Sequence, residues 1–275
     1  MIALSRLYHP MTDTPFQQDE TYREVAPCAA LAPFVRCFWG SEGPQHDRPA
    51  PAGIVIPDTC MDIIFHIDHA TQRVTAAFCA LDDTSSLTPA SEGGSGYAMT
   101  FAIRFYAWTT CLFAEDDLRG SLNGRYPAEQ FFPEIVRALS PVLADMTSLE
   151  NAIRAAEPLL LRCLHADRAD PALLNAIHRM LVTDGRARIA DVAAALALSP
   201  RQLERRFAAC MGASPKSFAS LIRYQLLWQE MLHAPRFSVL DAVDRFGYTD
   251  QAHLLSDFRR RHLMTPREAL AFAHR

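Results

Sequence analysis

Two stretches of this chain carry the same pattern about fifty residues apart, and this repeat limits the possible folds more than any other feature. The first covers residues 189–207 and the second covers residues 239–258. Each consists of a short apolar helical segment, a brief break and a second helical segment, and each continues to a hydroxyl residue followed by proline, Ser214-Pro215 and Thr265-Pro266. A doubled helix-turn-helix is typical of proteins that contact two successive stretches of one DNA duplex.

The second helix of each copy has a recognisable start. Ser199, followed by proline and by Gln202 at the third helical position, predicts a capping box and a helix from about Pro200 to Cys210. In the second copy Asp250 is the predicted cap. We therefore expect helix-turn-helix motifs at about residues 189–210 (the first head) and 239–261 (the second head).

A leucine and a phenylalanine four residues apart predict the inward side of each second helix. These pairs are Leu203 with Phe207 and Leu254 with Phe258. The outward side of such a helix enters the major groove, where arginine, glutamine and histidine read base edges. The predicted DNA-binding residues are Arg201, Gln202, Arg205, Arg206, Gln251, His253, Ser256 and Arg259, with Arg223 between the heads as a phosphate contact.

One unbroken helical pattern of 16 residues, 217–232, connects the two heads. At ~1.5 Å per residue it would span about 24 Å. A rod of that length can hold two heads roughly one duplex turn apart, ~34 Å centre to centre. Trp228 on this rod is expected to pack between the heads.

The charge of the chain is divided unevenly. Residues 171–275 contain 15 Lys and Arg against 9 Asp and Glu, which gives +6, whereas residues 1–170 contain 12 against 22, which gives -10; together they give the overall -4. A basic helical half and an acidic remainder fit a nucleic-acid-binding domain joined to a regulatory one. Seven irregularly spaced cysteines, no charged-then-apolar leader and no apolar run near ~20 residues predict a cytoplasmic protein without a membrane segment.

The fold class expected is α+β. Short β-rich runs in residues 1–126 predict an antiparallel, cupin-like β-barrel, with an exposed polar loop at residues 82–96. Residues 127–170 then show helical spacing and predict two helices that form a dimer seam. A polar stretch ending at Pro171 predicts the boundary of the helical domain, residues 171–275.

At the repeat the chain resembles the AraC/XylS family of bacterial transcription regulators. The resemblance is carried by Leu-Ser-Pro-Arg-Gln-Leu-Glu-Arg-Arg-Phe in the first copy, Phe-Gly-Tyr-Thr-Asp-Gln-Ala-His-Leu in the second, Arg223 and the closing Thr-Pro. It implies a seven-helix DNA-binding domain that acts at a promoter as activator or repressor, a preceding sensor or dimerisation domain, and RNA polymerase as a partner. The chain departs from the family pattern at Ser256, where arginine is usual, and at Leu263, where glycine is usual. The first head is therefore expected to dominate specificity.

For the N-terminal half the sequence leaves three alternatives. The leading one is a small-molecule effector bound in an aromatic pocket of the barrel, walled by Trp39, Phe65, Phe105 and Trp108. The second is a constitutive regulator whose barrel serves only for dimerisation or protein contacts, which a sealed core would favour. The third is a DNA-binding domain fused to an enzyme or to a metal or redox sensor.

The third alternative has the least support, because the chain has no nucleophile motif and no tight cysteine or histidine spacing. The scattered set Cys60, His66, His69 and Cys79 does not form a metal motif, since His66 and His69 would point to opposite faces of a strand. Neither catalytic residues nor metal ligands nor cofactors are predicted. The expected partners are double-stranded promoter DNA, an effector and a second copy of the chain.

Overall fold

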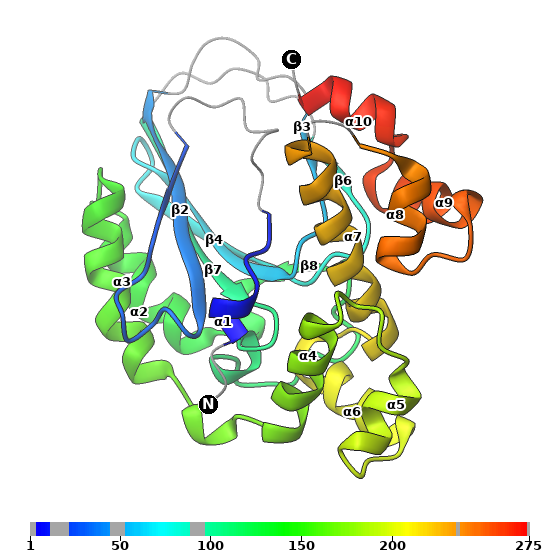
Figure 1. Cartoon of the computed structure of the whole chain (residues 1–275). Helices are drawn as coiled ribbons and strands as arrows, with labels where there is room; N and C mark the ends of the chain where they lie inside the picture. Colours follow the sequence, from blue (N-terminus) through cyan, green and yellow to red (C-terminus); the bar gives the residue numbers. More distant parts are fainter. Residues whose placement is uncertain (1–3, 12–21, 45–52, 89–96, 235–236, 274–275) are drawn as a thin grey trace.

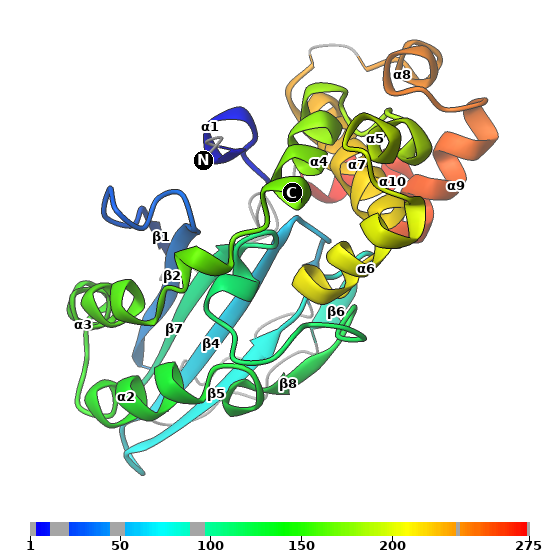
Figure 2. The same ribbon diagram turned by 90° about the horizontal axis from the view of Figure 1, so that it is seen from below.

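The N-terminal half (residues 1–170) is built on an antiparallel sheet. The computed structural model describes residues 4–11, 22–44, 53–88, 97–234 and 237–273. Its six-stranded sheet (Figure 1, Figure 2) has the strand order β1 (Arg23–Val25), β2 (Val35–Pro44), β7 (Tyr97–Tyr106), β4 (Cys60–Asp68), β5 (Arg73–Cys79) and β8 (Arg125–Pro127). A separate two-stranded ribbon pairs β3 (Gly53–Val55) with β6 (Ser86–Thr88).

The sheet is not closed, so the expectation of a complete barrel is wrong, although the α+β class is confirmed. In the described residues β1 and β8 are opposite edges that do not pair with each other. Each of these edge strands has only three residues, and the β3–β6 ribbon is not hydrogen-bonded into the main sheet. A closed barrel needs a continuous ring of paired strands with a consistent stagger, which this arrangement lacks.

The two faces of the sheet differ in chemistry because side chains alternate along each strand. Phe65, Phe101 and Phe105 share one face, are fully buried, and pack with Phe132 at the start of the next helix. The helices α2 (Pro133–Leu143) and α3 (Leu149–Cys163) cover this face (Figure 2), connected to the sheet by the 3₁₀ turns η1 (Thr110–Leu112) and η2 (Ala128–Gln130). The core of the N-terminal half lies between the sheet and these helices.

The helices α2 and α3 match the helical spacing expected for residues 127–170. Their buried residues, such as Leu139 and Leu160, face the sheet, while Val142 and Leu161 leave 43% and 42% of their surface exposed. A dimer seam on this side stays a prediction. The turn η3 (Ala166–Arg168) then leads to Asp170, whose carboxylate caps the next helix at Ala172 and Leu173.

The helical half (residues 171–275) follows the predicted order of helices. It consists, in the described residues, of α4 (Pro171–Val182), α5 (Ile189–Ala195), α6 (Pro200–Met211), α7 (Pro215–His233), α8 (Val239–Phe246), α9 (Gln251–His262) and α10 (Pro266–Ala273). The rod α7 has 19 residues and spans about 28 Å, three residues more than the pattern predicted. No helix among the described residues is both long and apolar enough to cross a lipid bilayer.

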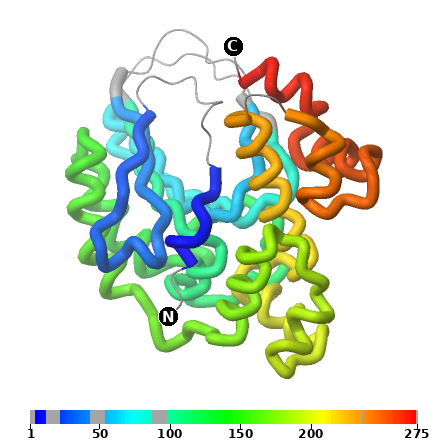
Figure 3. Tube along the Cα trace, viewed as in Figure 1, coloured from blue at the N-terminus to red at the C-terminus, as the bar shows by residue number. Residues whose placement is uncertain are grey.

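The long helix α7 lies on the other side of the sheet from α2 and α3, and the short helix α1 (Leu4–Leu7) lies beside α4 (Figure 1, Figure 3). Gln225 on α7 is fully buried and uses both ends of its amide. Its nitrogen donates to the Pro57 carbonyl at 2.7 Å, and its oxygen accepts from the Met11 backbone at 2.8 Å. This side chain ties α7 to two separate segments of the N-terminal half.

Candidate DNA-binding surface

The first head is formed by α5 and α6, and the start of α6 is fixed as the sequence predicts. The Ser199 hydroxyl accepts from the Gln202 backbone at 3.2 Å, and the Gln202 side-chain oxygen accepts from the Ser199 backbone at 2.8 Å. The predicted capping box is therefore confirmed. Leu203 and Phe207 are fully buried, which fixes the rotation of α6 about its axis.

Three of the four residues predicted on the outer side of α6 are exposed. These are Arg201, Gln202 and Arg205. Arg206 differs: its guanidinium forms an ion pair with Asp170, the residue that caps α4. Because Asp170 precedes Arg206 by 36 residues, no local pattern could have indicated this pair. Arg206 therefore connects α6 to α4, and a DNA contact by this residue would compete with that ion pair.

The second head is formed by α8 and α9. Asp250 accepts from the His253 backbone at 2.8 Å, so the predicted cap is confirmed, and Leu254 and Phe258 are fully buried. The predicted outward residues Gln251, His253, Ser256 and Arg259 are all exposed. His253 packs its ring edge-on against Tyr248 at 5.3 Å. The structure thus places these four side chains where DNA could reach them, and their contact with DNA stays a prediction.

Two side chains of the long helix α7 hold the second head against it. Trp228 is fully buried against Phe258 and His262 of α9, at centroid distances of 5.9 and 4.6 Å. Arg223 lies over the Tyr248 ring at 4.5 Å, within range of a cation–π interaction. The predicted phosphate contact is therefore a half-buried arginine that also stabilises the junction between α7 and the second head.

The C-terminal ends of the two recognition helices, α6 and α9, both have left-handed backbone conformation. Gly212 ends α6 with φ of +69°, which glycine adopts without strain. Leu263 ends α9 with φ of +61° at the position where the family usually has glycine. With leucine in place of the usual glycine, the helix still ends at this position. The leucine, however, adopts a left-handed backbone conformation that is unfavourable for it.

The N-terminal half contacts both recognition helices. The Leu118 backbone donates to the Ala209 carbonyl of α6 at 2.8 Å, and Leu118 and Ser121 lie so close to Gly212 that a Cβ there would meet them at 2.8 and 2.6 Å. At the second head, the Ser85 backbone and hydroxyl both donate to the Arg261 carbonyl, at 2.7 and 2.6 Å. The spacing of the heads is thus fixed through the N-terminal half as well as through α7.

Asp83 is the centre of the contact with the second head. Its carboxylate accepts from the Ser217 hydroxyl of α7 at 3.0 Å, and its carbonyl accepts from Arg261 at 3.0 Å. The side-chain nitrogen of Asn123 also donates to the Asp83 carboxylate. Residues 82–85 were expected in an exposed loop, but Ser85 is buried and Asp83 is half-buried. This part of the expectation is wrong, because Asp83 and Ser85 bind the helical half. Residues 89–96 of that loop lie outside the described residues.

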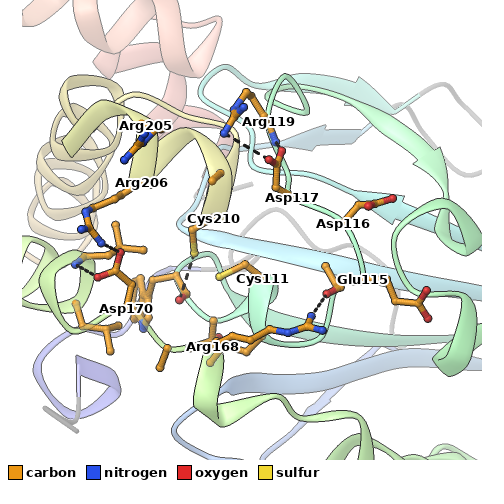
Figure 4. A pocket seen from close by; sticks show the side chains of 18 residues that line it. Cys111, Glu115, Asp116, Asp117, Arg119, Arg168, Asp170, Arg205, Arg206 and Cys210 are labelled. Carbon is orange, nitrogen blue, oxygen red and sulfur yellow. Dashed lines mark hydrogen bonds and ion pairs between the residues drawn. The ribbon is translucent and has the colours of Figure 1, made fainter. Parts of the chain in front are cut away.

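A cavity of about 610 Å³ lies where the N-terminal half, the 166–174 segment and α6 meet (Figure 4). Its apolar wall includes Trp108, Leu112 and Leu174, and its charged lining includes Arg168 and Arg205. The charged lining also includes four acids and two further arginines: Glu115, Asp116, Asp117, Asp170, Arg119 and Arg206. Figure 4 shows Glu115 and Asp116 pointing away from Arg205 and Arg206.

The four residues predicted to wall an effector pocket are not brought together. Phe65 and Phe105 lie in the core under α2 and α3, whereas Trp39 lies on the opposite face of the sheet, where its indole donates to Asp62 at 2.8 Å. Trp108 lies at the contact between the halves and lines the cavity there. A pocket shared by all four would have to pass through the sheet.

The cysteines are all free thiols. Burial raises the pKa of Cys37 to about 12 and raises the pKa of Cys60 well above its usual value, so neither is a ready thiolate. Within the described part of the chain no three His, Cys, Asp or Glu side chains are grouped as a metal site would require. The structure thus offers no positive support for the metal or redox alternative at these positions.

The comparisons agree with the geometry of the helical half. Residues 192–271 match a family described as a helix-turn-helix domain, and residues 23–120 match a domain of unknown function. Two helix-turn-helix motifs that are joined by one long helix and expose arginine and glutamine side chains are typical of a DNA-binding protein. The chain therefore has a helix-turn-helix domain of the kind found in DNA-binding transcription regulators, in agreement with its resemblance to the AraC/XylS family.

Several solved structures show similarity to the chain. An AraC-type regulator from Chromobacterium violaceum is 26% identical over 38% of this chain and 92% of that chain, with a TM-score of 0.35. An apo variant of ToxT from Vibrio cholerae is 11% identical over 86% and 97%, with a TM-score of 0.41. ToxT bound to an unsaturated fatty acid is 9% identical over 93% and 97%, with a TM-score of 0.40. No curated protein sequence matches the chain.

Proposed function

We propose that this regulator reads DNA mainly through its first head and is controlled by a small molecule bound in the cavity between the halves. The observation that carries the proposal is the position of Arg205. This residue lines the cavity of about 610 Å³ and also belongs to the outer side of α6. A ligand in the cavity would therefore contact a predicted DNA-binding residue directly, which provides a differential interaction between the free and DNA-bound states.

The lining of the cavity indicates the chemistry of the ligand. Trp108, Leu112 and Leu174 offer an apolar wall, and no ion pair of Arg168 or Arg205 is found in the described part of the chain. Arginine binds carboxylates through two parallel hydrogen bonds. The effector expected from this lining is a small amphipathic carboxylate, and 610 Å³ is in the range of ordinary ligand pockets.

The experiment compares carboxylates with their neutral amides. Benzoate and octanoate should raise the melting temperature and change the affinity for DNA, whereas benzamide and octanamide should do neither. Leu174→Trp, which fills the cavity, should abolish the response. Leu161→Trp adds the same side chain on the exposed surface of α3 and should keep it.

A constitutive regulator is the second candidate, and the sealed core of the sheet favours it. Phe65, Phe101 and Phe105 are fully buried and leave the face under α2 and α3 closed. If no carboxylate changes either the melting temperature or DNA binding, and Leu174→Trp binds DNA as the wild type does, the constitutive role is correct. Contacts with RNA polymerase and homodimer formation remain predictions in either case.

A further inference from the structure

A second hollow of about 510 Å³ lies along the outer side of α6, and one residue of the N-terminal half contributes to it. The α6 side supplies Arg201, Gln202 and Arg205 together with three further residues, Ser199, Glu204 and Ala208. The remaining lining residue is Arg119, from the loop that follows the acidic run at 115–117. Residues predicted to read DNA thus share a groove with an arginine outside the helix-turn-helix domain.

Arg119 is held in position by its neighbours in the chain. Leu118 is fully buried and its backbone donates to the Ala209 carbonyl at 2.8 Å. Ser121, on the other side, lies within 2.6 Å of the place where a Cβ on Gly212 would be. The backbone on both sides of Arg119 is therefore packed against the C-terminal end of α6, so the position of its side chain relative to α6 is set by the fold.

The charge of the groove suits a phosphate strand. Its lining contains three arginines and one glutamate, which gives +2. The guanidinium of Arg119 forms an ion pair with Asp117 at 3.4 Å, but both side chains are about half exposed, 57% and 50%. Exposed pairs of this kind are weak and screened by salt, so a phosphate oxygen can replace the Asp117 carboxylate.

The position of Arg119 also fits the way a recognition helix docks. The N-terminal residues of such a helix reach base edges, while the flanks of the helix meet the sugar–phosphate backbone. Arg201 and Gln202 lie in the first turn of α6, and Arg119 lies on its flank beside Ala208, further toward the C-terminus. A duplex whose bases face Arg201 would bring a phosphate strand along the groove toward Arg119.

We infer that Arg119 of the N-terminal half binds the DNA phosphate backbone, so that the first head and the 118–121 segment form one composite DNA-binding surface. The inference rests on the DNA-binding role of the first head. It adds a phosphate contact from outside the helix-turn-helix domain, which positions the first head on the duplex without reading sequence. The acidic residues Glu115, Asp116 and Asp117 precede Arg119 in the same loop, and obstruction of DNA by this loop is the opposite outcome of the test.

The test measures binding of the full chain to a fluorescein-labelled duplex of mixed sequence, about 25 base pairs long, by anisotropy between about 50 and 200 mM NaCl. Arg119→Ala should weaken binding about fivefold at the lowest salt and reduce the slope of log K against log salt by about 0.9. Asp117→Asn keeps an acceptor for the Arg119 backbone while removing the competing charge, and should tighten binding. Arg154→Ala, an exposed arginine on α3, is the matched control and should behave as the wild type does.

The possible outcomes separate the inference from the function on which it rests. If the wild type binds the duplex and Arg201→Ala weakens binding, but Arg119→Ala matches Arg154→Ala in affinity and slope, the inference is wrong and the function remains. Tighter binding by Arg119→Ala would show that the loop obstructs DNA, which also overturns the inference. Absence of salt-dependent binding by the wild type would overturn both.

Discussion

The contact between the N-terminal half and the first head can be tested with a pair of glycine substitutions. Gly212 and Gly247 end α6 and α8 with nearly the same left-handed φ, +69° and +65°. Alanine costs about 1–2 kcal/mol in this conformation at either position. At Gly247 the atoms nearest to the new methyl belong to the flexible Arg186 side chain, the first at 3.3 Å. At Gly212 it meets the Ser121 hydroxyl at 2.6 Å and the Leu118 carbonyl at 2.8 Å.

The Leu118 carbonyl is backbone, so relief at Gly212 requires the N-terminal half to move away from α6. Overpacking of this kind costs a further 1–3 kcal/mol or so. Because the strain from φ is common to both variants, the difference between them isolates the contact between the halves. We expect Gly212→Ala to melt roughly 6 °C below Gly247→Ala, taking about 2 kcal/mol at about 3 °C per kcal/mol for a chain of this size.

Differential scanning calorimetry at one protein concentration measures both variants beside the wild type, and binding of the mixed-sequence duplex is measured in parallel. Gly212→Ala should also change DNA affinity more than Gly247→Ala, because it displaces the 118–121 segment from α6. Equal melting temperatures for the two variants would refute the reasoning, since the left-handed strain would then account for the whole effect. The packing of Leu118 and Ser121 on α6 would in that case not exist in solution.

The second head offers three further tests. Leu263→Gly relieves the left-handed leucine and should stabilise the protein by about 1 kcal/mol, seen as a melting temperature higher by about 2–4 °C; a lower value would contradict the strain argument. Burial lowers the pKa of His262 to about 4, so the folded protein resists a proton that the unfolded chain accepts near pH 6.5, and stability should fall by about 3 kcal/mol as the pH falls from about 6.5 to 4. Denaturant titrations at several pH values test this, and His262→Gln should flatten that part of the curve. Ser256→Arg restores the arginine usual in the family at an exposed site, and should tighten binding to the mixed-sequence duplex about fivefold and steepen its salt slope by about 0.9; an unchanged slope would place Ser256 away from DNA.

Local chemistry explains why the helical half could be predicted closely. The Ser199–Gln202 capping box lies within one turn, and the buried pair Leu203 and Phe207 lies four residues apart, so both are set by short-range sequence. The same is true of Asp250 at the start of α9. Where a turn of helix contains all the groups involved, the pattern and the structure agree to within a residue or two.

The contacts between the halves could not be read in this way because their members are far apart in the chain. Ser85 and Arg261 are separated by 176 residues, and nothing in either segment indicates the other. Asp83 lies in a polar stretch with the composition of a loop, so its hydrogen bonds with α7 and α9 could not be predicted from the sequence. The prediction of a closed barrel fails for a related reason. Sequence patterns predict which segments are strands, but they do not determine which edge strands pair with each other.

The contacts of Leu118 with α6 and of Ser85 with α9 connect the region around the cavity to both heads. Leu118 holds α6 and Ser85 holds α9, while α7 connects the two heads over about 28 Å. Heads that enter successive major grooves must lie ~34 Å apart in the correct orientation. The segment with Trp108 and Leu118 lines the cavity or adjoins it, so a ligand that displaces this segment shifts α6 while Ser85 still holds α9. Under the proposed function, we therefore expect the spacing of the heads, and with it the ability of both to bind one duplex, to depend on what occupies the cavity.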